Sequence, residues 1–146
     1  MKIFIASDHA AYNEKQALIS ALKNKFEVID LGTNSCDSVN YADYAFAMVK
    51  KIQNTHDLGI LLCGSGIGIS IAANRFKGIR AALCRDIEDA KLSRLHNDAN
   101  IIAFAGRKTP VDEMVKMSEV FFSTEFEGGR HQKRIDSFNN LGEGSV

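Results

Sequence analysis

The stretch LGILLCGSGIGISIAA, residues 58–73, decides the fold. Its first five residues are apolar without polar alternation, which is typical of a strand covered by helices on both faces of a parallel sheet. Three glycines at alternate positions, Gly64, Gly66 and Gly68, then lead into a helix. A buried strand, a glycine-rich turn and a helix, in that order, predict a β-α unit whose backbone can approach a ligand closely.

The same alternation continues on both sides of this unit. Short apolar runs predict strands at residues 2–6, 27–31, 58–63, 80–83 and 101–104, and apolar residues recur at helical spacing between them. The order βαβαβ predicts an α/β fold, a three-layer α/β/α sandwich with a five-stranded parallel sheet. Residues 1–146 fit one domain. A last helix, from Arg130 to about Leu141, is expected outside the alternating core, followed by a frayed end at residues 142–146.

Composition excludes several classes of protein. Lys and Arg (18) balance Asp and Glu (18), so the global charge favours neither nucleic acid nor an anionic membrane as a partner. The three cysteines are odd in number and lack C-x-x-C spacing, which argues against a disulfide framework and a thiolate zinc site. Free thiols suit a reducing cytoplasm. No apolar run approaches membrane-spanning length, and we expect no signal peptide or anchor.

Residues suited to chemistry follow three of the predicted strands. In an open parallel sheet, ligands collect at the carboxyl ends of the strands, so residues 7–9, 63–68 and 105–107 should meet on one rim. At the helix N-terminus after the glycine turn, Cys63 could ionise more readily than a free cysteine and remove a carbon-bound proton, while the loop amides hold an oxyanion. The alternative is that Cys63 is only the buried end of a strand.

The glycine loop fits neither common nucleotide motif. Ile67, Gly68 and Ile69 occupy the place where G-x-G-x-x-G requires a small residue for close helix packing, and the G-K-[ST] ending of a triphosphate loop is absent. The loop therefore favours a small anion over a nucleotide.

Three further groups of residues have both a functional and a structural interpretation. Asp8 and His9 could hold sugar hydroxyls or a phosphate, or Asp8 could cap the next helix. His96 could move protons near neutral pH with Asn97 as an oxyanion donor, or it could be a helix C-terminal residue. Arg130 and Arg134 lie one turn apart and suit a phosphate dianion, or they form a solvated basic helix end. No His, Asp and Glu cluster on these loops has metal-ligand spacing, so we expect no metal.

Several motifs together resemble the family of type B ribose-5-phosphate isomerases and the related galactose-6-phosphate isomerases. The resemblance runs nearly end to end and is highly specific. It is carried by residues 7–10 (SDHA), 30–33 (DLGT), Tyr41, 63–81 (CGSGIGISIAANRFKGIRA), 93–100 (SRLHNDAN), Gly106-Arg107 and 127–134 (EGGRHQKR).

The resemblance implies a Rossmann-like sandwich that forms homodimers, with each active site built from both subunits and the C-terminal helix, about residues 129–141, at the interface. It implies Cys63 as the base that moves the proton between C1 and C2, His96 as the group that opens the furanose ring, and Ser65 as a proton shuttle. It implies that no cofactor is needed. The residues that it implies bind the substrate are Asp8, His9, Gly64, Gly66, Ile67, Gly68, Asn97, Arg107, Arg130 and Arg134.

Two positions refine the resemblance. One branch of the family uses a glutamate on the glycine loop, where this chain has Ile69, so the cysteine mechanism applies. Ser65 replaces a threonine common in that branch and keeps the hydroxyl. The expected reaction interconverts ribose 5-phosphate and ribulose 5-phosphate through a cis-enediolate, as in the pentose phosphate pathway.

Three alternatives stay open at this point. The chain could isomerise a hexose 6-phosphate such as galactose 6-phosphate or allose 6-phosphate, it could be a non-catalytic phosphosugar sensor, or it could be a redox protein. The lack of a second cysteine nearby in sequence disfavours the redox protein. Sequence also leaves open whether dimers pair into tetramers.

Overall fold

All five predicted strands form one parallel sheet. The computed structural model describes residues 1–146 and orders the strands β2-β1-β3-β5-β4. Their bounds are β1 (Lys2–Ser7), β2 (Glu27–Asp30), β3 (Leu58–Cys63), β4 (Ala81–Leu83) and β5 (Ile101–Ala105). The three central strands are almost wholly buried, whereas β2 and β4 are short and half-exposed. The fully apolar β5 therefore lies inside the sheet, and β4 forms the edge although it comes first in the chain.

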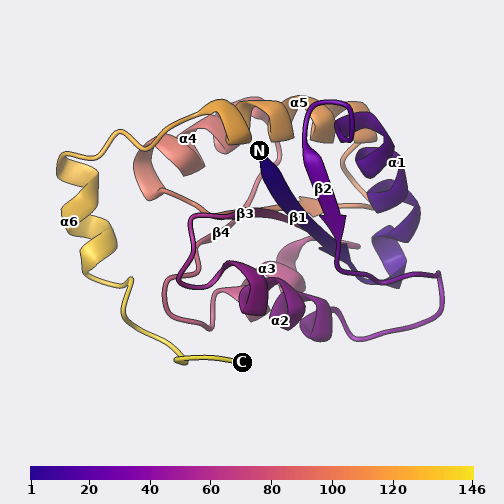
Figure 1. Cartoon of the computed structure of the whole chain (residues 1–146), viewed down its shortest axis with the longest axis horizontal. Helices are drawn as coiled ribbons and strands as arrows, with labels where there is room; N and C mark the ends of the chain where they lie inside the picture. The colour runs from indigo at the N-terminus through magenta and orange to yellow at the C-terminus, as the bar shows by residue number, and fades with distance from the viewer.

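Helices cover both faces of the sheet (Figure 1). One face carries α1 (Tyr12–Leu22), α4 (Ile87–Asn97) and α5 (Val111–Ser123), and a 3-10 turn, η1 (His9–Ala11), precedes α1. The opposite face carries α2 (Tyr41–Ile52) and α3 (Ile67–Ala73). The three-layer sandwich is confirmed. The last helix, α6 (Arg130–Asp136), lies beyond one end of these layers.

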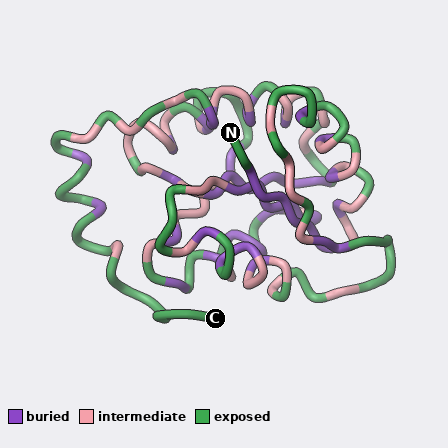
Figure 2. Tube along the Cα trace, in the orientation of Figure 1, coloured by how far each residue is buried: buried purple, intermediate pink, exposed green.

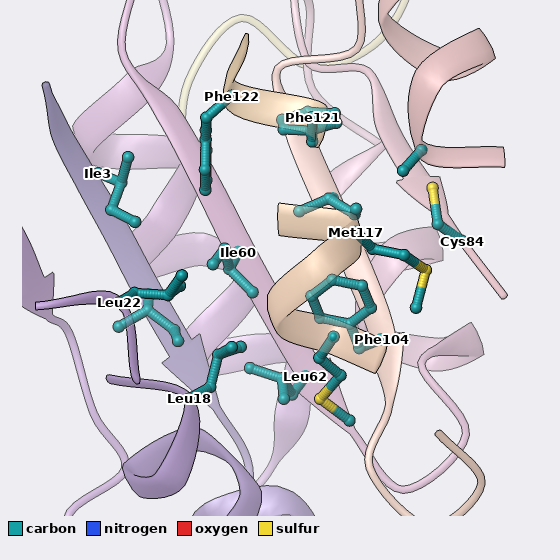
Figure 3. Close-up of a cluster of buried hydrophobic side chains, with 14 of the residues drawn as sticks. Ile3, Leu18, Leu22, Ile60, Leu62, Cys84, Phe104, Met117, Phe121 and Phe122 are labelled. Atoms are coloured by element: carbon teal, nitrogen blue, oxygen red, sulfur yellow. The ribbon is translucent and has the colours of Figure 1, made fainter. Parts of the chain in front are cut away.

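A separate apolar core fills each side of the sheet. Figure 3 shows the larger one, to which α1 contributes Leu18, α5 contributes Phe121 and β3 contributes Ile60. On the other side, α2 and α3 pack against the alternate residues of the same strands, including Leu61 and Cys63. Buried segments coincide with the sheet and with the inner faces of the helices (Figure 2). None of the helices is long and apolar enough to cross a membrane.

The C-terminal segment differs from its prediction. Helix α6 begins at Arg130 as expected but ends at Asp136, not near Leu141. The chain then turns back, and the backbone oxygen of Asn139 accepts the N–H of Gly78 at 2.9 Å. Glu143 exchanges backbone hydrogen bonds with the Arg75–Lys77 segment, so the expected fraying of this residue is wrong. These long-range bonds replace the continued helix.

Candidate active site

The loops after β1 and β3 face each other at the point where the sheet changes direction. From β1 the chain moves outward to β2 and then returns to β3 on the other side of β1. In open parallel sheets, the crevice at the carboxyl ends of two such strands is the usual ligand site. Ser7 pairs with Leu62, and the N–H of Asp8 donates to the Leu62 oxygen at 3.2 Å. Asp8 is thus placed beside Cys63, as the predicted rim requires.

The sulfur of Cys63 points into the glycine loop. Cys63 is only 4% exposed, and its Sγ accepts the N–H of Gly66 at 3.1 Å. A donated N–H at this position stabilises negative charge on the sulfur. The contact places Sγ at the start of α3.

The loop amides divide into two sets. The N–H of Gly66 is taken by Cys63, and that of Ile67 donates to Ser65 Oγ at 3.2 Å. The amides of Gly64, Ser65 and Gly68 have no acceptor within the chain. Three free N–H groups beside a sulfur can bind an oxyanion next to a base. The sequence predicted that amides along the whole loop bind an oxyanion. The structure leaves fewer of them free, because the N–H groups of Gly66 and Ile67 already have acceptors within the chain.

Two of the glycines have a steric reason to be glycine. Gly66 has φ +72°, and an added Cβ would lie 2.5 Å from Leu83 Cδ1 and 2.9 Å from the Phe104 oxygen. At Gly68, an added Cβ would lie 2.6 Å from the ring of Tyr41. Tyr41 is half-exposed at the start of α2 and covers the loop. The sequence analysis did not assign Tyr41 to the site, and only its place among the family motifs pointed to it.

Asp8 and His9 are both held in fixed orientations. Asp8 Oδ1 accepts the Ala10 N–H at 3.0 Å, so the capping interpretation is correct, and its second oxygen stays available. His9 Nδ1 accepts the N–H of Val39 at 3.1 Å. Its Nε2 must then carry the proton in the neutral ring and can donate to an anion in the crevice.

Arg107 lies across the glycine loop. Its N–H donates to the Gly64 oxygen at 3.0 Å, and its Nη1 lies 3.0 Å from the position of a Cβ on Gly64. The guanidinium therefore reaches the same rim as Cys63 and can attract an anion there.

His96 and Asn97 lie at the other end of the strands from Cys63. They end α4, which runs from the carboxyl ends of the strands back to their amino ends before β5 begins. The nearby Asn100 oxygen accepts the N–H of Gly59 at 3.0 Å. Gly59 lies four residues before Cys63 along β3, a distance of about 13 Å. One chain therefore does not bring His96 to Cys63.

A partly buried guanidinium, that of Arg80, fixes the turn after His96. Arg80 Nε donates to the oxygens of Asn97 and Asp98, at 3.0 and 2.9 Å, and Nη2 pairs with the Asp98 carboxylate at 3.1 Å. Burial lowers the pKa of Arg80 below its ordinary value, and Asp98 opposes that shift. The same side chain reaches Asn139, so it ties the C-terminal segment to this turn.

The start of α6 packs against the end of α4. The rings of His96 and His131 stack with centroids 4.2 Å apart and planes inclined by 14°. Glu127 Oε2 lies 3.8 Å from His96 Nε2 and 3.6 Å from His131 Nε2. Arg130 and Arg134 are exposed on the same short helix. The predicted site residues thus form two groups, one around Cys63 and one around His96.

The cluster of His96, Glu127 and His131 was missed by the sequence analysis, which expected no metal ligands on the loops. The three side chains offer donor atoms within 4.8 Å of one another. An imidazole nitrogen binds a metal ion in the plane of its ring, at about 2.0–2.1 Å. Two nearly parallel rings 4.2 Å apart do not share a point in both planes. The observed arrangement fits ring stacking beside a carboxylate better than a metal centre.

The other cysteines lie outside both groups. Burial raises the pKa of the Cys84 thiol to about 12, and the nearby Asp89 and Asp86 act in the same direction. Cys36 is exposed on the loop before α2, and all three cysteines are free thiols. Of the buried cysteines, Cys63 alone lies at the crevice.

Comparisons with known proteins decide the family. The sequence profile of the Ribose/Galactose Isomerase family matches residues 3–138. The chain belongs to the ribose/galactose isomerase family. Ribose-5-phosphate isomerase B of Escherichia coli is 39% identical to this family member over 142 residues, which span 96% of this chain and 95% of the relative.

Solved structures of the family agree with this assignment. A ribose 5-phosphate isomerase from Thermotoga maritima is 48% identical and superposes with a TM-score of 0.91, covering 94% of this chain and 97% of that one. Ribose-5-phosphate isomerase B of Mycoplasma genitalium, solved with bound ribulose-5-phosphate, is 43% identical with a TM-score of 0.88, covering 94% and 93% of the two chains. The expected resemblance to the ribose/galactose isomerase family is confirmed.

Proposed function

We propose that the chain is an aldose–ketose isomerase that interconverts ribose 5-phosphate and ribulose 5-phosphate. The observation that carries this proposal is the sulfur of Cys63, which accepts the Gly66 N–H in a glycine loop with three free amides, within a chain of the ribose/galactose isomerase family. Relatives named for this reaction match along nearly the whole chain, and one of them was solved with ribulose-5-phosphate.

The reaction divides between the two groups of residues. His96 opens the furanose ring by moving a proton from the anomeric hydroxyl to the ring oxygen. Cys63 then removes the C2 proton, which leaves a cis-enediolate, and returns a proton to C1. Ser65 moves a proton between the two sugar oxygens. The steps consist of proton transfers alone.

The remaining residues hold the substrate. The free amides of the glycine loop and Asn97 bind the enediolate oxygens, and Asp8 and His9 bind the sugar end. Arg107, Arg130 and Arg134 bind the phosphate, for which paired guanidinium groups are well suited. Binding of this kind anchors the sugar while the reacting carbons stay within reach of Cys63.

We further propose a homodimer in which His96, Asn97, Arg130 and Arg134 of one subunit complete the site around Cys63 of the other. The separation of the two groups within one chain supports this arrangement, because a single subunit leaves Cys63 without a ring-opening group. A two-fold dimer places each group against its complement.

Apolar side chains mark the surfaces that would meet. Ile67 and Ile71, one turn apart on α3, are 50% and 60% exposed beside the glycine loop. A cavity of about 640 Å³ lies next to Asn97, where Phe138 and Leu141 line it. Exposed apolar groups next to each half of a divided site favour an interface there. The C-terminal helix α6 would lie at that interface, and the free cysteines suit a cytoplasmic enzyme.

A substrate panel tests the proposal. Purified protein is incubated separately with ribose 5-phosphate, galactose 6-phosphate and allose 6-phosphate, and ketose formation is measured together with exchange of the C2 hydrogen for solvent deuterium. We expect the highest kcat/KM with ribose 5-phosphate. A higher kcat/KM with either hexose phosphate would assign the alternative substrate. Binding of all three sugars without exchange would indicate a sensor.

A further inference from the structure

His96, the proposed ring-opening histidine, contacts two other side chains. Its imidazole lies nearly parallel to that of His131, with ring centroids 4.2 Å apart. Glu127 Oε2 lies 3.8 Å from Nε2 of His96 and 3.6 Å from Nε2 of His131. His131 is 5% exposed, and its Nε2 has no hydrogen-bond partner although it is buried. A buried polar atom without a partner is uncommon and calls for an explanation.

The segment that carries Glu127 is fixed to α4 by the backbone. The N–H of Glu127 donates to the Leu95 oxygen at 3.1 Å, and Arg94 Nε donates to the Thr124 oxygen at 3.2 Å. Gly128 and Gly129 then adopt φ values of +70° and +57°, with no atom near an added Cβ. The two glycines turn the chain so that His131 returns onto the His96 ring.

The charges of His131 and Glu127 both favour a positive charge on His96. Burial lowers the pKa of His131 below its ordinary value, and the adjacent His96 and Arg130 lower it further. His131 therefore stays neutral near pH 7 and does not repel a positive charge on its neighbour. Glu127, half-exposed, supplies the one negative charge next to both rings.

Ring opening requires this kind of support. The C1–O4 bond breaks, the anomeric hydroxyl loses a proton as C1=O1 forms, and the ring oxygen gains a proton. A single imidazole that takes the first proton and gives the second passes through the imidazolium form. A carboxylate at 3.8 Å stabilises that form, and a stacked neutral ring holds its orientation.

We infer that Glu127 and His131 are positioning residues for His96, which orient its ring and stabilise its charged form during ring opening at the partner subunit's Cys63. This inference rests on the proposed isomerase activity and extends it to two residues that do not touch the reacting atoms.

The two directions of the reaction allow a selective test. Ribulose 5-phosphate is open-chain, because its C5 oxygen carries the phosphate and a ring closed through O4 would have only four members. Exchange of its C1 hydrogen with D₂O therefore needs Cys63 and the glycine loop but no ring opening. Conversion of ribose 5-phosphate needs both steps.

Both rates are measured for the wild type and for Glu127→Gln, His131→Ala and His131→Phe. We expect conversion to fall about ten-fold or more in Glu127→Gln and His131→Ala, a part of the 10²–10⁴-fold that a positioned acid–base group contributes. C1 exchange should stay within about two-fold, since the base is untouched. His131→Phe keeps a flat ring for stacking and should retain more conversion than His131→Ala. Glu125→Gln, at an exposed acid two residues from Glu127, is the matched control and should change neither rate.

Unchanged conversion in Glu127→Gln and His131→Ala would overturn the inference, and so would an equal loss of conversion and exchange, which would indicate general damage to the fold. A wild type that catalyses neither conversion nor exchange would instead refute the proposed function itself.

Discussion

Mixing two inactive variants should restore activity if each site is shared between subunits. Cys63→Ala removes the proposed base, and His96→Ala removes the proposed ring-opening group, so each variant on its own should lose most of its turnover. In a mixed dimer, the His96→Ala subunit still supplies Cys63 and the Cys63→Ala subunit still supplies His96. These two intact groups meet in one of the two sites, because within each chain Cys63 and His96 lie at opposite ends of β3.

The recovery follows from counting sites. Random assembly of equal amounts makes half of the dimers mixed, and each mixed dimer has one intact site, so activity should reach about one quarter of wild type. The variants are co-refolded or co-expressed, and ribulose 5-phosphate formation is measured per total subunit. A site contained in one chain would give no recovery at all.

A second mixture provides the control. Wild type is combined in equal amounts with the double variant Cys63→Ala/His96→Ala. With shared sites, mixed dimers are inactive and about one quarter of the activity remains, whereas sites within one chain would leave about one half. No recovery in the first mixture together with one half in the second would refute the shared site.

Three further predictions concern single residues. Cys63→Ala should lower kcat at least about 10²-fold while the Kd for ribose 5-phosphate, measured by calorimetry, changes only a few-fold, and wild-type-like turnover would exclude the role of the base. Arg134→Ala should mainly raise KM, because phosphate binding is remote from the bond change, with the exposed neighbour Lys133→Ala as control; an effect on kcat alone would contradict phosphate binding. Cys84, whose pKa is raised to about 12 by burial, should stay a protonated thiol and resist alkylation at mildly alkaline pH while the exposed Cys36 reacts, as peptide mass spectrometry would show.

The layered fold was predictable because its central strands carry an unambiguous signal. Residues 58–62 and 101–104 are apolar throughout, and all of them except the half-buried Leu58 are buried in the structure. The placement of β5 between β3 and β4 was not assigned from the sequence. It depends on which strand buries more apolar surface, and half-exposed β4 takes the edge.

The site was only partly predictable. Residues after β1, β3 and β5 were expected on one rim, because parallel strands end at the same edge, and Asp8, Cys63 and Arg107 are found there. The position of His96 at the other end of the strands was not assigned from the sequence, although it follows from the direction of α4 once the helix is placed between β4 and β5. The contacts of Glu127 and His131 depend on how the segment before α6 packs on α4, and no local pattern encodes that packing. The early end of α6 has a similar cause, since Asn139 bonds to residues about sixty positions earlier.

The division of the site between opposite edges of the sheet has a consequence for how such an enzyme responds to dilution. In the proposed homodimer, a subunit on its own would hold only half of each catalytic set, so turnover per chain should decline as subunits separate on dilution. A substitution at Ile71 that weakens pairing should then lower turnover at low protein concentration and much less at high concentration.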